Sequence, residues 1–175
     1  MITTERLSLR LPEAGDRDAL CGMFADSAVM ADLGPVKDAD ATDLALAKHD
    51  ADRWEGLGFR VVERRDDRAV LGFCGLKRGD AHNPIAGEIE AGWIIDRPYW
   101  RHGYAVEAMA AVLAAGWQRR DAERIVAITS VVNTASQRLM QRLGMRCLPD
   151  GDFDHPLMIV GDRLRPMATF AIDRP

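Results

Sequence analysis

The sequence predicts a mixed α/β fold in which helices pack against one sheet. Segments with strand-type alternation or β-branched runs recur along the chain, and segments with helical periodicity stand between them. No repeat, low-complexity tract or linker divides the 175 residues. Hydrophobic residues make up 47% and charged residues 29%, which is typical of a soluble globular domain. We therefore expect a single domain over residues 1–175.

The N-terminal half is expected to form a strand, two helices and a hairpin. In the first strand Leu7 and Leu9 alternate with polar residues. Gly34-Pro35 breaks the chain between the two helices, and a charged Arg65-Asp66-Asp67 turn closes the hairpin. The expected elements are a strand over Thr3–Arg10, helices over Asp16–Ala25 and Thr42–Trp54, and hairpin strands over Phe59–Arg64 and Ala69–Leu76.

The C-terminal half alternates strands and helices. Its clearest element is a helix, because apolar residues from Val106 to Trp117 recur at i, i+3, i+4, i+7, i+8 and i+11. Gly144 stops the second helix. The expected elements are a strand over Glu88–Ile95, a loop over Tyr99–Tyr104, the clear helix, a buried strand over Ile125–Thr129, a helix over Asn133–Leu143 and a last strand over Met167–Ile172.

Charge and cysteine usage exclude several classes of function. The net charge of −4 and the pI of about 5.6 give no support to nucleic-acid binding. Residues 97–146 nevertheless carry eight Arg against three acids, which suits a polyanionic small ligand or an unevenly charged surface. Three scattered Cys and four scattered His predict neither disulfides nor a metal site. Without a signal-type N-terminus or a membrane span, a cytoplasmic location is expected.

The segment Ile94–Ala108 has the layout of a phosphate-binding loop. A strand leads through a short loop into an amphipathic helix, whose first N–H groups are unpaired and carry partial positive charge. Gly103 permits a positive φ, and Ala105 is small enough not to block a ligand. A plain loop with a helix cap would give the same pattern. Neither GxxxxGK[ST] nor GxGxxG is present, so nucleotide-binding α/β domains of other kinds are disfavoured.

Residues 90–96 and 99–108, read EAGWIID and YWRHGYAVEA, closely resemble the acyl-CoA motif of the GNAT acetyltransferases. They are most similar to the branch that includes the ribosomal-protein alanine N-acetyltransferases, where an aromatic residue such as Trp100 often replaces Gln or Arg. Three further segments resemble the family in order. They are residues 4–10, residues 133–136 with 142–145, and residues 153–156 with 164–167.

The resemblance implies a mixed, mostly antiparallel sheet of six to seven strands, flanked by about four helices and splayed beside the fourth strand to admit pantetheine. It also implies acetyl transfer from acetyl-CoA to a primary amine by direct attack. Backbone amides of the strand would pair with pantetheine, loop and helix amides would hold the pyrophosphate, and Asn133 would contact the pantetheine arm besides capping its helix. The implied cofactor-binding residues are Ile94, Ile95, Arg101, His102, Gly103, Tyr104, Ala105, Val106 and Asn133.

Two glutamates and a serine are the candidate catalytic residues. Glu88 and Glu90 share one strand face, about 6–7 Å apart, so repulsion and burial would raise one pKa toward that of a useful base. Glu90 matches a Glu that some family members use as base; the alternatives are a solvated carboxylate on an edge strand and one that binds a basic substrate. Ser136 shares a helix face with Met140 and Leu143. It is the candidate acid, or else a serine bonded to its own helix.

The acceptor is left open between a protein N-terminus, a polyamine, an amino acid and a drug amine. Its identity depends on loops such as Asp32–Thr42 and Gly79–Pro84. Met167 and Phe170 stand where relatives often have His and Tyr, which keeps open a non-catalytic acyl-CoA-binding sensor or partner domain. Either a monomer or a homodimer is compatible with the sequence. Trp54, Trp93 and Trp117 are expected in the core or in pocket walls.

Overall fold

The computed structural model describes residues 1–119 and 121–175; Arg120, one of the eight Arg in the basic segment, lies outside the described residues. The strands are β1 (Ile2–Thr3), β2 (Leu7–Arg10), β3 (Gly58–Arg64), β4 (Val70–Arg78), β5 (Ile89–Ile95), β6 (Arg124–Ser130), β7 (Arg146–Cys147), β8 (Phe153–Asp154) and β9 (Pro166–Asp173). The α-helices are α1 (Arg17–Ala25), α2 (Ser27–Met30), α3 (Ala39–Asp50), α4 (Tyr104–Gly116) and α5 (Thr134–Arg142). Single 3₁₀ turns lie at Ala14–Asp16, Arg53–Glu55 and Arg97–Tyr99.

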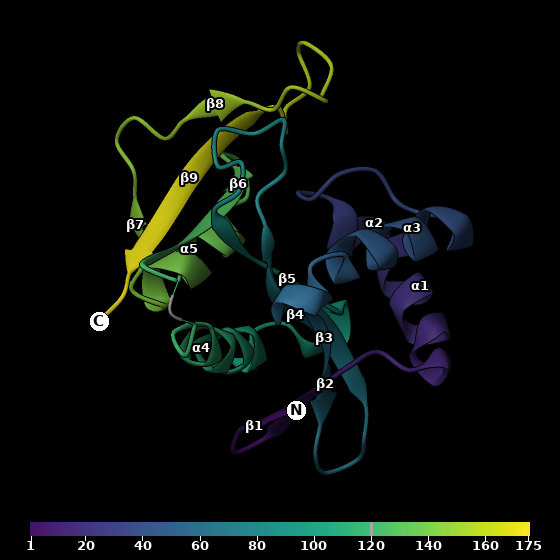
Figure 1. Cartoon of the computed structure of the whole chain (residues 1–175). Helices are drawn as coiled ribbons and strands as arrows, with labels where there is room; N and C mark the ends of the chain where they lie inside the picture. Colours follow the sequence, from purple (N-terminus) through teal and green to yellow (C-terminus); the bar gives the residue numbers. More distant parts are fainter. Residues whose placement is uncertain (120) are drawn as a thin grey trace.

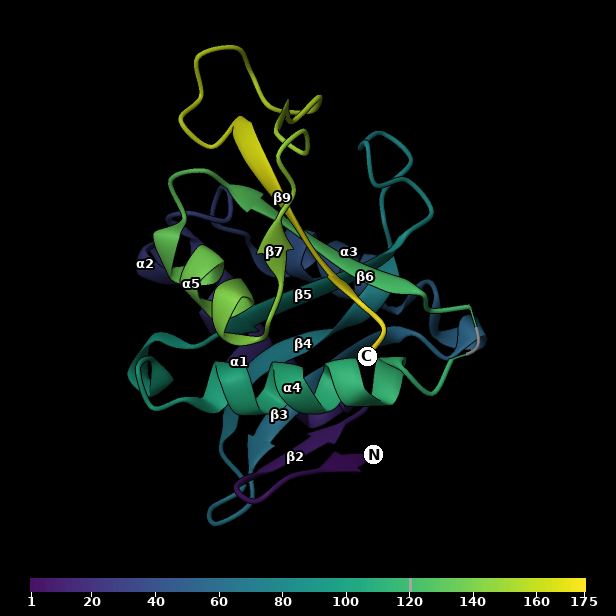
Figure 2. The ribbon, with the colours of Figure 1, turned by 90° about the vertical axis from the view of Figure 1, so that its left-hand side faces the viewer.

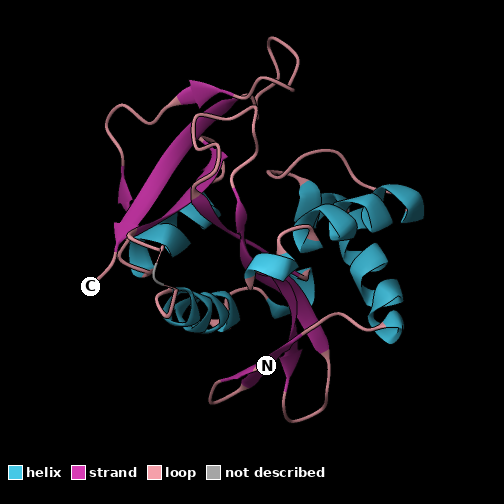
Figure 3. Cartoon of the chain, viewed as in Figure 1, coloured by secondary structure: helices cyan, strands magenta, loops and turns pink. Residues whose placement is uncertain are grey.

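One mixed, mostly antiparallel sheet contains all these strands, which confirms the predicted fold class. Its order is β1-β2-β3-β4-β5-β6-β9-β7, with β8 also paired to β9. Figure 3 shows the strands in magenta between helices in cyan. Within the described residues there are nine strands, more than expected, because β1, β7 and β8 have only two residues each. The six longer strands correspond to the elements that alternation and β-branched runs predict.

Helices cover both faces of the sheet. In Figures 1 and 2, α4 and α5 lie on one face, and α1, α2 and α3 lie on the other. Strand residues alternate between the two layers of core, as the pleat requires. Thus Val62 packs in the cluster on the α4 side, whereas Val61 packs with residues of α1 and α2.

The sheet opens between β5 and β6. These parallel strands pair only at Ile89↔Ile125 and Glu90↔Val126, although β5 continues to Ile95. Beyond this point β6 pairs with β9 on its other side, as far as Ser130↔Met167. The predicted splay is therefore present, beside the fourth of the longer strands.

The predicted first strand is interrupted, and one helix was not predicted. A turn at residues 4–6 separates β1 from β2, because Thr4 Oγ1 and the Arg6 N–H both donate to the carboxylate of Glu107 in α4. The four-residue α2 begins where Asp26 accepts hydrogen bonds from the N–H groups of Ala28 and Val29. Four residues are too few for a visible helical period.

The expectation that Trp54 lies in the core or in a pocket wall is wrong. Its residue is 83% exposed, in the 3₁₀ turn after α3. By contrast Trp117 packs against the core on the α4 side.

Two kinds of feature are absent from the described residues. No helix there combines the length and the apolar character that crossing a bilayer requires. Nor do three or more His, Cys, Asp or Glu side chains in that part of the chain gather as a metal site would require.

Candidate functional site

A cavity of about 280 Å³ lies where β5 and β6 separate. Its walls come from both sides of the opening: α1, α3 and the segment after α2 on one side, α5 and β6 on the other, and β3, β4 and β5 between them. The cavity contains three of the predicted site residues, Glu90, Ile94 and Ser136. The splay of the sheet therefore brings together residues that are distant in sequence.

Glu90 is buried in the wall of this cavity and is ion-paired. Its residue is only 8% exposed, and the Lys77 Nζ lies 2.7 Å from Glu90 Oε2. The pair exists because Lys77 and Glu90 are direct cross-strand partners in β4 and β5. Lys77 also lies 3.3 Å from Asp80, which in turn pairs with Lys48 at 2.8 Å. Two ammonium groups and two carboxylates thus form one balanced network.

Burial raises the pKa of Glu90, and the nearby Lys77 ammonium lowers it again. The net direction is upward, as the sequence predicted. Glu88 is not among the largest influences on Glu90, which are burial and the charges of Lys77, Asp80 and Lys48.

Glu88 does not line the cavity in the described structure. It makes a two-pronged ion pair with Arg124, with nitrogen–oxygen distances of 2.6 and 2.9 Å. Since β5 and β6 are paired at this level, the contact joins the two strands at the closed end of the splay. Glu88 therefore makes a structural contact away from the cavity.

Ser136 faces the cavity from the first turn of α5. Its N–H donates to Asn133 Oδ1 at 3.0 Å, so Asn133 caps the helix as predicted. Asn133 Nδ2 also donates to the carbonyl of Asp32, which ties α5 to the segment after α2. Among the residues that the structure describes, the Ser136 hydroxyl has no hydrogen-bond partner. The alternative of a serine bonded to its own helix is therefore not what is observed.

Among the described residues, no strand pairs with the N–H groups of Trp93 and Ile95 in β5. The Asp96 N–H donates to Leu71 in the β4 direction, and strand geometry makes successive residues point to opposite edges. The Ile94 N–H thus faces β4, whereas those of Trp93 and Ile95 face the opening. Of the expected pair of amides, Ile94 and Ile95, only the N–H of Ile95 faces the opening. The alternation along the strand could have shown that two adjacent amides cannot face one ligand.

The loop before α4 presents a row of unpaired amides. Gly103 has φ of 82° and occupies the N-cap position, as its predicted positive φ requires. In the part of the chain that the structure describes, no backbone N–H from residue 101 to residue 106 finds a protein acceptor. Arg101, His102 and Gly103 are exposed, Tyr104 is buried, and Ala105 and Val106 are half-buried. This row can bind an anion without any side chain.

Side chains hold the loop in place. Trp100 Nε1 donates to the Ile95 carbonyl at 2.7 Å, which ties the loop to the end of β5. Arg6 Nη1 donates to the His102 carbonyl at 3.0 Å, and Arg6 Nε pairs with Glu107 at 2.6 Å. The carboxylate of Glu107, near the free amides, is thereby neutralised.

The part of the cavity formed by α1, α3, β3 and β4 is lined by aromatic rings and by residues that the sequence did not single out. His49 stacks on Phe59 with ring centroids 4.2 Å apart, and Phe59 lies 5.3 Å from Phe73. Burial lowers the pKa of His49 to about 4, so its imidazole is neutral at pH 7. Lys37 lies with its Nζ 5.4 Å from the centre of the Phe24 ring. No short motif marks these residues, because α1, α3 and β3 bring them together from distant positions.

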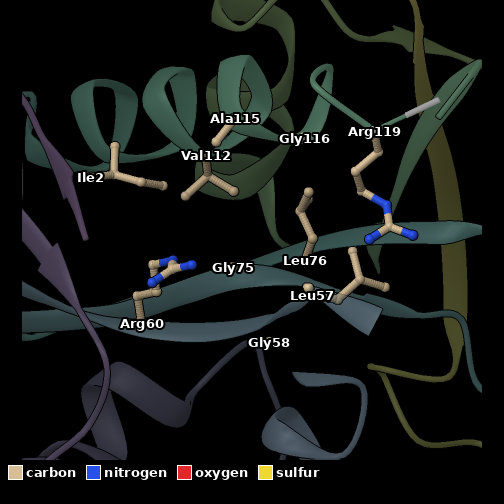
Figure 4. A pocket seen from close by; sticks show the side chains of 11 residues that line it. Ile2, Leu57, Gly58, Arg60, Gly75, Leu76, Val112, Ala115, Gly116 and Arg119 are labelled. Carbon is tan, nitrogen blue, oxygen red and sulfur yellow. The ribbon is translucent and has the colours of Figure 1, made fainter. Parts of the chain in front are cut away.

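A second cavity, of about 60 Å³, lies under α4. Figure 4 shows Val112 and Ala115 of the helix above it and Arg60 of β3 below. It has room only for a few water molecules, and none of the predicted site residues lines it. The larger cavity is therefore the candidate active site.

Comparisons with known proteins agree with this geometry. Residues 6–146 match the family model described as an acetyltransferase (GNAT) domain. The chain is similar to the uncharacterized N-acetyltransferase YnaD of Bacillus subtilis (strain 168), with 31% identity over 160 residues that cover 86% of this chain and 89% of the relative.

Solved structures share the fold over nearly the whole chain. A GNAT-family acetyltransferase from Bacillus anthracis matches with a TM-score of 0.77 and 26% identity, covering 98% of this chain and 97% of its own. Spermidine N-acetyltransferase from Vibrio cholerae, in complex with CoA and spermine, matches with a TM-score of 0.74 and 20% identity, covering 97% and 96%. At that identity, the second likeness concerns the fold alone.

Proposed function

The chain belongs to the GNAT acetyltransferase family, and on that premise we propose that it moves the acetyl group of acetyl-CoA to a primary amine, on a small molecule or a protein N-terminus. GNAT enzymes use acetyl-CoA as co-substrate. We assign this activity to one domain over residues 1–175, since strands from both ends of the chain join one sheet.

The described backbone fits acetyl-CoA. The free amides of Trp93 and Ile95 suit the amide groups of pantetheine, which would extend β5 on its open side. The unpaired amides from Arg101 to Val106 suit the pyrophosphate at the N-terminus of α4. Gly103 allows close approach, because it has no side chain over the loop.

Glu90 is the proposed general base. The amine must lose a proton as it attacks the thioester, and a buried carboxylate with a raised pKa accepts protons better than an exposed one. The ion pair with Lys77 favours the charged form, which is the form that can accept a proton. Glu88 is not retained as a candidate, because it does not line the cavity that contains Glu90 and Ser136 in the described structure.

Ser136 is the proposed acid. Its free hydroxyl lines the same cavity as Glu90, from the opposite side of the splay. A donor there would stabilise the thiolate that leaves when the thioester is cleaved, and would supply its proton. Asn133 places this serine at the start of α5, and it is also the proposed contact of the pantetheine arm.

One observation carries the proposal: a buried, ion-paired Glu90 and a free Ser136 hydroxyl line the cavity that opens where β5 and β6 separate. The test is calorimetric titration with acetyl-CoA, followed by turnover with a panel of amines. We expect binding, and we expect Glu90→Gln to retain it while lowering kcat by about 10²–10⁴-fold, the usual contribution of a general base.

The binding site is tested with two variants at one position. Gly103→Ala and Gly103→Glu share the strain of a side chain at positive φ. Only the second adds a negative charge beside the proposed pyrophosphate. We expect Gly103→Glu to bind acetyl-CoA at least about 10-fold more weakly than Gly103→Ala, a difference of about 1.4 kcal/mol.

Two results would contradict the proposal in different ways. Equal affinity of the two variants would place the pyrophosphate elsewhere. Tight binding of acetyl-CoA without acetylation of any amine would favour the alternative of an acyl-CoA-binding sensor or partner domain.

A further inference from the structure

The acceptor end of the cavity is formed by the N-terminal helices. Phe24 of α1, Met30 of α2 and His49 of α3 line it, with Leu33 and Lys37 from the segment between α2 and α3. This segment is part of residues 32–42, the first of the two loops on which acceptor identity was expected to depend. The proposed acetyl-CoA contacts lie elsewhere, on β5, α4 and α5. This wall is therefore free to select the amine.

Most charges near this wall are balanced. Lys77 contacts both Glu90 and Asp80, and Asp80 contacts Lys48. His49 is neutral, because burial lowers its pKa to about 4. These groups together therefore contribute little net charge to the wall of the cavity.

Lys37 is the exception. It is half-buried in the cavity wall, and burial lowers its pKa. Within residues 1–119 and 121–175 no carboxylate lies within ion-pair distance of it. The adjacent Asp38 is engaged as the N-cap of α3, where it accepts a hydrogen bond from the Ala41 N–H at 2.8 Å. The Phe24 ring, 5.4 Å from the ammonium, holds the cation at the cavity wall.

We propose that the acceptor is an amino acid with an apolar side chain, whose carboxylate binds Lys37 while its amine approaches Glu90. This inference rests on the proposed acetyltransferase function. The apolar part would lie against Phe24, Phe59 and Phe73, which line the same cavity. The volume of about 280 Å³, part of which the acetyl-pantetheine end must fill, suits an acceptor of this size.

The same charges disfavour a polyamine. The sequence suggested a cationic acceptor from Glu88 and Glu90, but both carboxylates are paired with cations of the protein. A second ammonium group near Lys37 would be repelled in a partly desolvated site. The charge of the wall thus complements an acceptor with an acidic group and one amine.

The test compares acceptors that differ in one group. Leucine, leucinamide and isopentylamine share a side chain and a primary amine, and only leucine carries the carboxylate; phenylalanine and phenylalaninamide repeat the comparison with an aromatic group. Spermidine represents the polyamines. Because hydrogen bonds to charged groups contribute about 1.5–3 kcal/mol, we expect kcat/KM for the amino acids to exceed that for their amides by about 10–100-fold.

Lys37 is tested by two substitutions and a control. Lys37→Met keeps the apolar stem and removes the charge, so it should raise KM for leucine about 10-fold or more and leave leucinamide nearly unchanged. Lys37→Arg should restore most of the preference. Arg17→Met removes the same charge from α1 outside the cavity, where Arg17 pairs with Asp43 on the surface, and should change neither substrate.

The outcomes separate this inference from the proposed function. Turnover of amides, amines or spermidine as fast as of amino acids would overturn the inference and leave the acetyltransferase function standing. An amino-acid preference that survives Lys37→Met would overturn the role of Lys37. Binding of acetyl-CoA without turnover of any acceptor would overturn both proposals.

Discussion

Glu90 is subject to two opposing influences that can be separated by substitution. Burial favours the neutral acid and raises its pKa, whereas Lys77, 2.7 Å away, favours the carboxylate. A base must be deprotonated to act. The ion pair therefore sets the lowest pH at which the proposed base works.

Replacing Lys77 by Met should move the acid limb of the pH–rate profile to higher pH. Without the ammonium, the charge that opposes the effect of burial is lost, so the pKa of Glu90 should rise further. The measurement is kcat/KM across pH 5–9. Lys77→Arg keeps the charge and should keep the limb in place. An unmoved limb in a folded Lys77→Met protein would remove Glu90 from the role of base.

His49 offers a separate prediction for stability. Its pKa is about 4 when folded and 6.5 when unfolded, so the unfolded chain binds more protons between these values. Stability is therefore lost as the pH falls from 6.5, and the loss ends below about pH 4. From pH 7 to pH 5 this residue alone should lower the free energy of unfolding by about 2 kcal/mol.

Urea unfolding of His49→Phe at the two pH values checks this contribution. The variant keeps an aromatic ring against Phe59 and has no imidazole to protonate. It should lose about 2 kcal/mol less than the wild type over this range. The control is His82→Gln, which removes an exposed imidazole. Identical losses in wild type and His49→Phe would show that His49 titrates normally in the folded state.

Among the side chains that line the cavity, the sequence predicted those whose position follows from the period of one strand or helix. It did not predict those whose neighbours come from distant parts of the chain. The alternation of β5 and the period of α5 pointed to Glu90 and Ser136 without any structure. Lys77 and Lys37 were missed, because pairing across β4 and β5 and the path of the chain after α2 decide their neighbours. No short segment contains that information.

Among the elements, α4 and α5 were the best predicted, since both carry their signals locally. The start of α4 needs Gly103 at positive φ, and the start of α5 needs the side chain of Asn133. By contrast the break between β1 and β2 depends on Glu107, about a hundred residues later. A pattern read over ten residues could not reveal it.

The cap of α5 can be tested at a single position. Asn133→Ala removes the acceptor for the Ser136 N–H and should lower the free energy of unfolding by about 1 kcal/mol. Asn133→Asp keeps an acceptor and adds a negative charge at a helix N-terminus, so it should retain most of the stability. Urea unfolding of both variants measures the difference. If both variants lose equal stability, the hydrogen bond from the Ser136 N–H to residue 133 contributes less than the bond from Asn133 Nδ2 to the Asp32 carbonyl, which both variants lack.

Over the whole molecule, the sheet is two ladders joined by a short parallel seam. Strands β1 to β5 form one ladder and β6, β9, β7 and β8 the other, with only two residue pairs between them. The family resemblance anticipated this opening, whereas composition and periodicity did not, because they describe elements and not the spacing between them. Each half has its own helices, and the candidate active site lies in the opening.

If acetyl-CoA occupies the opening along β5, amide hydrogen exchange should change in an alternating pattern. Trp93 and Ile95 face the opening and should exchange fast in the free protein, whereas Gly92 and Ile94 are already paired with β4. At a free acetyl-CoA concentration of 100 times Kd, a bond to the ligand adds up to about 2.7 kcal/mol of protection, or about 100-fold slower exchange. Residue-resolved exchange by NMR measures it. Equal slowing at all four residues would indicate a general tightening of the sheet, and the ligand would then not be an added strand beside β5.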